Sequence, residues 1–342
     1  MAKRRQHFVP KFYLRAFQSA PNRIHLYHLN SCKAIKNASL RDQCYVHKFY
    51  GPSDKVENRL AELEDMAAPV IRAICESGEP PQLGTDQHEI LLEFVGLQIL
   101  RTPVARQRIK EMVTKVNDQI FGDHDPLTGS GLTRFSPLTE HEALGLQLNS
   151  AQEYVDAMSD LELHVARVGG RARLFTSDNP VFRYNSYCRG VHNYGVLGAD
   201  SRGFQIFLPL SPRILLLLYD GTVYEVGDAA SGRTSYLRRE DVERFNATQI
   251  LSAEECAYFS DWSEVGSVRR SVSNHLPHKQ VGMIRVEQSP QVGNSATIHH
   301  WEDQSKLRFT LPLSRLRWRA SKVPVEERAT FTRRGWTWKY AT

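Results

Sequence analysis

The order of its sequence patterns predicts that this chain of 342 residues has an α+β fold. We expect a β-rich N-terminal segment, central helices and a C-terminal mixed or antiparallel sheet. Three observations carry this prediction. Apolar and polar residues alternate over residues 23–30, as in a half-buried strand. Apolar residues then recur at helical spacing between residues 54 and 121, and alternation returns after Asp160.

The first fifty residues predict one short helix and two strand-like segments. Pro10 stands where a helix can begin, because its fixed φ angle suits the first helical turn. Residues 23–30 predict a strand. Residues 40–51, which end in Phe-Tyr-Gly, predict a strand or a turn.

Helical spacing dominates the next hundred residues. Asp86 and Glu89 resemble a capping box at the start of one long helical region. Thr102-Pro103 should kink or split that region, because proline removes a backbone donor. Residues 122–137 are rich in Gly, Pro, Asp and Ser and predict a loop. The expected helical regions are residues 54–76, 86–121 and 140–158.

Strand patterns return after Asp160. The expected strands are residues 161–168, 171–177, 203–210, 213–220 and 257–260. Residues 242–257 predict a helix, and residues 263–342 are rich in Trp, Arg and Ser with weak periodicity.

Composition excludes several classes of protein. Hydrophobic residues make up 41% of the chain and charged residues 24%, which is typical of a globular protein and excludes disordered and collagen-like chains. The longest apolar stretch, Ile214–Tyr219, is far shorter than the roughly 20 residues of a membrane helix. The basic N-terminus has no apolar core of a secretory signal, so we expect a cytoplasmic protein without a membrane partner. Five scattered cysteines without a CxxC pair argue against a disulfide framework and a thiolate zinc site.

The net charge of +6 is unevenly distributed. Residues 1–50 carry ten Lys or Arg and one acid, and residues 301–342 carry ten Lys or Arg and four acids, so the middle of the chain is acidic. This asymmetry suggests an anionic partner, of which nucleic acid is the commonest. The alternative is that the basic ends dock on the acidic middle of the same chain.

Several segments resemble the bacterial domain-of-unknown-function 4238 family. They are QHFVPKFYLRAFQ, RIHLYHLN, CYVHKFY, the helix with Glu57 and Glu64, LQILRTPVAR, FTSDNPV, FLPLSP, and Asn246 ahead of AYFSD. The resemblance covers about residues 6–261 and implies no activity, because the family has none assigned. It suggests a family-like domain over residues 1–262 and a basic, Trp-rich extension over residues 263–342.

Asp178 and Asn179 are the sharpest candidates for catalysis. They follow the apolar segment RLFTS, and polar side chains at the end of a strand are rigidly placed beside an open loop. Asp178 would act as a general base or metal ligand, with Asn179 as a donor that orients the substrate. The alternative is an Asx turn before Pro180.

His7 is the third catalytic candidate, because histidine titrates near neutral pH and belongs to the family's opening motif. Tyr13 and Arg15 in the same segment are candidates for substrate binding. The alternative is that His7 is a hydrogen-bonded structural residue and that the aromatic residues around it form core.

Gln98, Arg101 and Thr102 complete the predicted substrate-binding set. Gln98 falls on an otherwise apolar helical face and needs a buried partner, since an unpaired buried amide costs about 1–3 kcal/mol. Arg101 can bind a phosphate or carboxylate through two hydrogen bonds. The alternative is a structural hydrogen bond that closes the kink at Pro103.

Metal and nucleotide motifs are weak or missing. The thirteen histidines lack an HExxH pattern, and only Asp123-His124-Asp125 suggests metal ligands, so a divalent metal is a candidate cofactor without an assigned site. The sequence has no P-loop, GxGxxG, GxSxG or protein-kinase motif.

The tail interleaves tryptophan with basic residues, a pattern of proteins that bind single-stranded nucleic acid. Its aromatic residues are Trp301, Trp318, Trp336 and Trp338, and its basic residues include Arg308, Arg315, Arg317, Arg319, Arg333, Arg334 and Lys339. A pair of amphipathic strands would give the same alternation.

These observations support two hypotheses. The first is a hydrolase acting on an anionic substrate, a nuclease being one form of it, in which His7 and Asp178 converge in one cleft with Arg101. The second is a non-catalytic module that binds nucleic acid or a partner protein.

Overall fold

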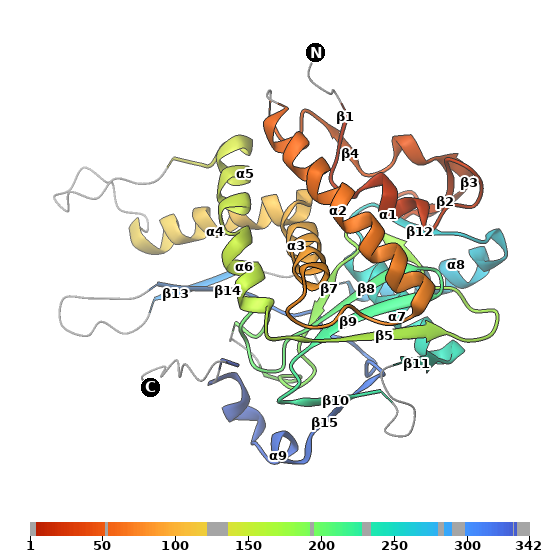
Figure 1. Cartoon of the computed structure of the whole chain (residues 1–342). Helices are drawn as coiled ribbons and strands as arrows, with labels where there is room; N and C mark the ends of the chain where they lie inside the picture. The colour runs from red at the N-terminus through yellow and green to blue at the C-terminus, as the bar shows by residue number, and fades with distance from the viewer. Residues whose placement is uncertain are drawn as a thin grey trace, which may run out of the picture.

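The computed structural model describes residues 5–51, 54–121, 136–191, 195–227, 234–279, 284–288, 298–330 and 332–333. The predicted α+β fold is confirmed: N-terminal strands precede a group of helices, and a sheet follows them (Figure 1). The predicted loop at residues 122–137, with Asp123-His124-Asp125, lies mostly outside the described residues, as do Trp336 and Trp338.

The elements follow one another with short connections through most of the chain. The strands are β1 (Arg5–His7), β2 (Arg23–His28), β3 (Lys33–Ser39), β4 (Tyr45–His47), β5 (Glu162–Val168), β6 (Thr176–Ser177), β7 (Phe182–Tyr184), β8 (Gln205–Ser211), β9 (Ile214–Tyr219), β10 (Tyr224–Val226), β11 (Thr234–Leu237), β12 (Cys256–Phe259), β13 (Ile284–Gln288), β14 (Ile298–Glu302) and β15 (Ser314–Leu316). The α-helices are α1 (Lys11–Arg15), α2 (Lys55–Ser77), α3 (Asp86–Leu100), α4 (Pro103–Phe121), α5 (Glu140–Asn149), α6 (Ala151–Met158), α7 (Arg239–Ser252), α8 (Val265–His275) and α9 (Trp318–Ser321).

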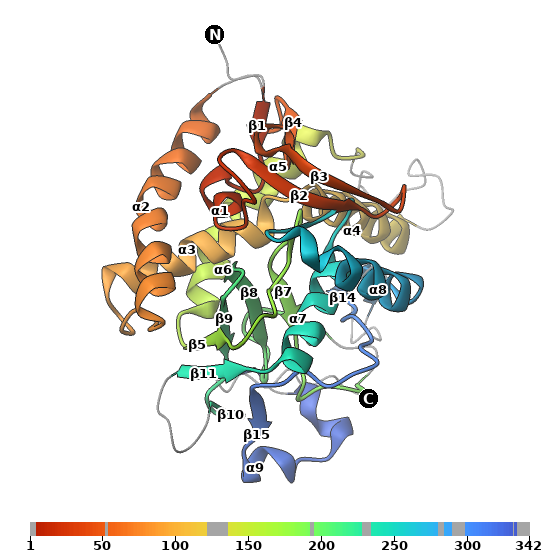
Figure 2. The same cartoon turned by 90° about the vertical axis from the view of Figure 1, so that its right-hand side faces the viewer.

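A five-stranded sheet in the order β11-β5-β9-β8-β7 forms the centre of the molecule. Its pairs are antiparallel except for β11 with β5. Figure 2 shows α2 and α3 on one side of this sheet and α7 on the other. Both faces are therefore buried, which explains why β9 is apolar at every position instead of alternating.

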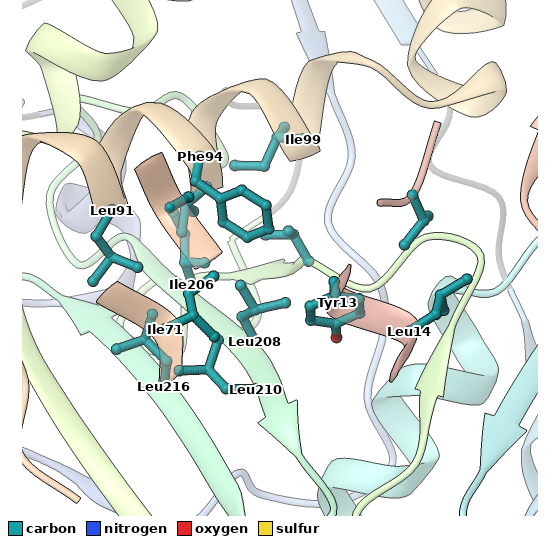
Figure 3. Packing of buried hydrophobic residues seen from close by; sticks show 14 of the residues in the cluster. Tyr13, Leu14, Ile71, Leu91, Phe94, Ile99, Ile206, Leu208, Leu210 and Leu216 are labelled. Atoms are coloured by element: carbon teal, nitrogen blue, oxygen red, sulfur yellow. The ribbon is translucent and has the colours of Figure 1, made fainter. Parts of the chain in front are cut away.

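Side chains from the two faces of the sheet enter two different cores. Ile206, Leu208 and Leu216 pack against α2 and α3, together with Leu91 and Phe94 of α3 (Figure 3). The neighbouring positions of the same strands, Phe207, Leu215 and Leu217, point into the second core. This core also contains residues of α7 and of the C-terminal segments; these include Val242, Phe245, Leu307 and Leu311.

A second, four-stranded sheet in the order β3-β2-β12-β6 joins distant parts of the chain. The N-terminal hairpin β2-β3 pairs with β12, so that Leu26 lies opposite Tyr258. One face of this sheet, with Phe259, packs against α7 and α8 through Val268. The N-terminal segment is thus built into the body of the fold.

The structure corrects four details of the predicted elements. The side chain of Thr85, rather than Asp86, caps α3 by accepting the backbone N–H of His88. The predicted helix over residues 140–158 is two helices that meet at Ser150. The helix predicted over residues 242–257 begins at Arg239 and ends at Ser252.

The fourth correction concerns residues 171–177, of which only Thr176–Ser177 form a strand. The side chain of Asn246 accepts the N–H of Phe175 at 2.7 Å and donates to the carbonyl of Arg173 at 2.9 Å. A side chain thus satisfies these backbone groups, so the segment needs no neighbouring strand.

Residues beyond 262 pack against several parts of the preceding chain. Helix α8 packs against α7, β13 lies along α4, and β15 pairs with β10. Trp301 is buried and Trp318 is 72% exposed. Arg333 forms an ion pair with Asp160 at 2.8 Å, so at least this basic residue docks on the same chain. The boundary between residues 262 and 263 stays a prediction.

All five cysteines are free, and Cys44, Cys188 and Cys256 are buried as expected for core residues. None of the helices in the described ranges is both long and apolar enough to cross a membrane.

Candidate functional site

His7 lies on β1, which pairs with β4. Its Nδ1–H donates to the carbonyl of Gln43 at 3.0 Å, and its ring packs against Tyr45. Burial and the charge of Lys11 lower the pKa of His7 to about 4. The imidazole is therefore neutral at pH 7, and Nε2 is the ring nitrogen left to accept a proton.

Gln98 and Arg101 form a buried polar network that fixes the N-terminal strand on α3. The Gln98 side chain donates to the carbonyl of Phe8 at 3.1 Å and accepts two hydrogen bonds from Arg101 at 3.0 and 3.1 Å. Arg101 also pairs with Glu64 at 2.9 Å. Thr102 accepts the backbone N–H of Ala105 at 3.2 Å at the start of α4. The polar groups of these three of the five predicted substrate-binding residues are thus bound inside the protein.

Tyr13 and Arg15 lie on α1 and differ in exposure. The buried hydroxyl of Tyr13 donates to the carbonyl of Pro209 at 2.6 Å and lies 2.7 Å from the hydroxyl of Thr176. Burial raises the pKa of Tyr13. Arg15 is exposed at the last residue of the helix. Tyr13 therefore anchors α1 on the central sheet, whereas Arg15 faces solvent.

Asp178 follows β6 directly, and its side chain is buried. Its carboxylate accepts backbone N–H bonds from Glu254 at 2.8 Å, Glu255 at 2.7 Å and Cys256 at 2.9 Å. Burial raises the pKa of Asp178, and these three donors oppose that rise. Asp178 thereby holds the connection between α7 and β12, the segment that carries Glu254.

Asn179 lies in the wall of a cavity of about 210 Å³. Its side-chain amide donates to the carbonyl of Ser252 at 3.1 Å. The cavity lies between the first half of α4, the segment from Asn179 to β7, the end of α7 and the C-terminal residues. Its polar lining residues include Gln107, Arg108, Glu111, Asn179, Arg183, Ser252, Glu254, Lys279, Glu302 and Ser305.

Two guanidinium groups of this cavity meet on one carboxylate. Arg108 Nη2 lies 2.9 Å from Glu302 Oε1, and Arg183 Nη2 lies 2.6 Å from Glu302 Oε2. Burial alone would lower the pKa of Arg183, but Glu302 and Tyr154 outweigh it and raise the pKa. Burial lowers the pKa of Arg108, whose Nε has no hydrogen-bond partner within the described ranges.

Glu254 and Lys279 lie on the other side of the cavity. Desolvation and the charges of Asp178 and Glu255 raise the pKa of Glu254, whereas the charges of Lys279 and Arg108 oppose this rise. Burial lowers the pKa of Lys279, whose ammonium donates to the carbonyl of Ala253. A carboxyl group with a raised pKa beside a cavity is a candidate for proton transfer.

The charges around the cavity favour an anion. Arg108, Arg183 and Lys279 contribute three positive charges, and Glu302 and Glu254 contribute two negative ones. The third carboxylate that lines the cavity, Glu111, pairs with Lys115 at 2.6 Å. One positive charge is left over, and it grows when Glu254 is protonated.

A wider hollow of about 710 Å³ adjoins this cavity and shares Gln107 and Glu254 with it. Its other polar lining residues include His47, Arg106, Glu140 and His141. Glu254 therefore stands between a small charged cavity and a larger opening, where a bound molecule can extend.

The described residues contain no cluster of three His, Cys, Asp or Glu side chains that could hold a metal ion. Neither this cavity nor the adjoining hollow is lined by His7, Asp178 or Arg101. His7 and Arg101 lie near each other, because Gln98 binds both Arg101 and the carbonyl of Phe8, the residue after His7.

The sequence pointed to Asn179 but missed the charged residues around it. Arg183 follows Asn179 by four positions, and Arg108 follows the LRTPVAR segment by two positions. The position of these two arginines just beyond motif segments was thus the sequence feature that could have identified them. Glu302 offered none, because its role depends on a contact with distant residues.

One comparison with known proteins gives a match. The family model described as "Protein of unknown function (DUF4238)" matches residues 5–263, in agreement with the resemblance of residues 6–261. No curated protein and no solved structure matches this chain. The matched region contains Arg108, Asn179, Arg183 and Glu254, whereas Lys279 and Glu302 lie beyond it.

Proposed function

We propose that this chain, which belongs to the DUF4238 family of proteins of unknown function, is a hydrolase acting on a small anionic substrate. The observation that carries the proposal is the position of Glu254 beside two guanidinium groups in one cavity. A carboxyl group with a raised pKa supplies proton transfer, and guanidinium groups bind phosphate or carboxylate.

In this proposal Arg108 and Arg183 bind the anionic group of the substrate. Asn179 lies in the same wall and orients the bond to be broken. Glu254 acts as the general base that removes a proton from the attacking water, and then returns that proton to the leaving group. Asp178 is a positioning residue, because its carboxylate fixes the backbone of Glu254 through the 2.8 Å hydrogen bond.

The size of the site favours a small substrate over a nucleic-acid duplex. A cavity of about 210 Å³ is smaller than the 300–1,000 Å³ typical of drug-sized ligands, although the adjoining hollow of about 710 Å³ gives room for a leaving group. A nuclease remains one form of the proposal, in which a single phosphodiester enters the cavity.

The test is hydrolysis by the full chain of a set of nitrophenyl esters. The substrates are p-nitrophenyl phosphate, bis(p-nitrophenyl) phosphate, mono-p-nitrophenyl succinate and the neutral p-nitrophenyl acetate, each with and without Mg²⁺ or Mn²⁺. Single- and double-stranded DNA and RNA test the nuclease form. We expect turnover of an anionic substrate and a preference for it over the neutral ester.

Glu254→Gln and Glu255→Gln form a matched pair of variants, because the two carboxylates are neighbours and only Glu254 lines the cavity. Loss of a general base lowers kcat by about 10²–10⁴-fold, so Glu254→Gln should be inactive while Glu255→Gln keeps its activity. Arg108→Gln should raise KM for anionic substrates. Equal activity of the two glutamate variants, or no turnover of any substrate, would contradict the proposal and favour a binding protein.

A further inference from the structure

A third and larger depression lies at the opposite end of α7 from Glu254. It is an open groove of about 1310 Å³ between the Gly169-Gly170 turn, the β11–α7 connection and the residues that lead into β15. Figure 2 shows β11, β10, β15 and α9 together at this end of the molecule. The mechanism proposed above does not use this groove.

Arginine dominates the charge of this groove, which we call the arginine groove. Its lining includes six arginines: Arg171, Arg173, Arg238, Arg239, Arg244 and Arg315. Three acidic residues line it as well: Asp241, Glu243 and Glu264. The groove therefore carries an excess of three positive charges, contributed by residues from three separate parts of the chain.

Most of these guanidinium groups form no ion pair with any residue that the structure describes. Glu243 pairs with Arg239 at 3.1 Å. Arg173 donates to two backbone carbonyls, the nearer of them at 2.9 Å. The other four form no ion pair within the described ranges; they are Arg171, Arg238, Arg244 and Arg315. Several positive charges that line one groove raise its electrostatic potential and attract an anion.

An exposed aromatic ring stands among these arginines. Tyr236 lies on β11, the edge strand of the central sheet, and is 72% exposed although both of its neighbours, Ser235 and Leu237, are buried. Beyond Arg315 the chain places a second exposed ring, Trp318, beside Lys322, whose ammonium lies 3.9 Å from the ring centre.

We propose that the arginine groove binds single-stranded nucleic acid. Guanidinium groups bind the phosphates along the strand, and Tyr236 stacks on an unpaired base, as aromatic residues do in other proteins that bind single strands. A small anion would need only two or three converging donors. An acidic peptide would use the charges and the free edge of β11, but it would gain nothing from an exposed tyrosine ring.

The test is fluorescence anisotropy with the full chain and four labelled probes. The probes are a 20-nucleotide oligo-dT, an oligo-U of the same length, a 20-base-pair duplex and a 20-residue poly-glutamate peptide, each at 50 and 200 mM NaCl. We expect the single strands to bind more tightly than the duplex and the peptide, with affinity falling steeply as salt rises.

Two triple variants distinguish binding in the arginine groove from non-specific attraction to the protein's positive charge. The groove variant combines Arg171→Gln, Arg244→Gln and Arg315→Gln. Its control combines Arg41→Gln, Arg72→Gln and Arg269→Gln, which remove the same charge from exposed positions elsewhere. Loss of three phosphate contacts should reduce the slope of log K against log salt by about 2 and weaken binding at least tenfold, whereas the control should change neither.

Substitutions of Tyr236 test the stacking contribution to affinity without changing the charge of the protein. Tyr236→Ala should weaken single-strand binding roughly tenfold, and Tyr236→Phe should retain it, because stacking needs only the ring. The proposal is overturned if oligo-dT does not bind at 50 mM NaCl, or if the control weakens binding as much as the groove variant. Equal affinity for poly-glutamate, with no effect of Tyr236→Ala, would overturn it in favour of a protein partner.

Discussion

Asp178→Ala removes a carboxylate that accepts three backbone N–H bonds from residues 254–256. The sequence suggested that Asp178 is catalytic, whereas its contacts indicate that it holds the chain between α7 and β12. These two roles predict different effects on the free energy of unfolding. A catalytic carboxylate is dispensable for folding, but the acceptor of three buried or half-buried donors is not.

The structure gives the size of the expected effect. A hydrogen bond to a charged group contributes about 1.5–3 kcal/mol, and Asp178 accepts three. The raised pKa of Asp178 means that its burial offsets part of this gain. After the substitution, water can reach the N–H groups of the exposed residues Glu254 and Glu255, but the N–H of buried Cys256 stays unpaired. We therefore expect the variant to lose about 3–5 kcal/mol of stability.

Equilibrium unfolding in urea, followed by circular dichroism, measures this loss. The denaturation midpoint should fall while the slope m stays the same, because the surface exposed on unfolding hardly changes. Glu153→Ala, at an exposed position on α6, is the control and should stay within about 0.5 kcal/mol of the parent chain. A free energy of unfolding within about 1 kcal/mol of the parent for Asp178→Ala would refute the structural role.

Three further substitutions test other contacts. His7 has a folded pKa of about 4, below its ordinary 6.5, so its neutral form stabilises the fold above pH 6.5, and this stability is lost as the pH falls toward 4. Partial exposure limits the loss to roughly 2 kcal/mol, and His7→Asn should flatten stability against pH in urea titrations between pH 4 and 7. Glu302→Gln leaves Arg108 and Arg183 without their carboxylate and should cost about 3 kcal/mol, seen as a lower Tm; an unchanged Tm would mean that the pair is not formed. Tyr13→Phe removes the bond to the Pro209 carbonyl and should cost about 1–2 kcal/mol in urea unfolding, and no loss would contradict that bond.

The sequence predicted most of the elements because local spacing encodes them. The break at Pro103 and the buried strand β9 followed from proline chemistry and from an uninterrupted apolar run. Residues 171–175 were misjudged because Asn246, more than seventy positions later, satisfies their backbone groups. No local pattern carries that information.

In the candidate site, too, the sequence predicts what depends on local spacing and misses what depends on contacts between distant residues. Asn179 could be singled out from the sequence, because polar residues after an apolar segment mark the end of a strand. The pairing of Arg108 and Arg183 with Glu302 was not, because it joins residues 119 or more positions apart. Tertiary packing also decides that Asn179 lines the cavity whereas its neighbour Asp178 does not.

The pairing of β2 with β12 has a consequence for how the chain is made. At 5–20 residues per second, a ribosome needs about 10–50 s after synthesising Leu26 before Tyr258, its partner across the sheet, emerges. During that interval Leu14 and Phe17, which have no exposed surface in the finished fold, have no sheet to cover them. A segment that is synthesised well before its partner strand is thus among the last to be completed, and it must be shielded from aggregation while translation proceeds.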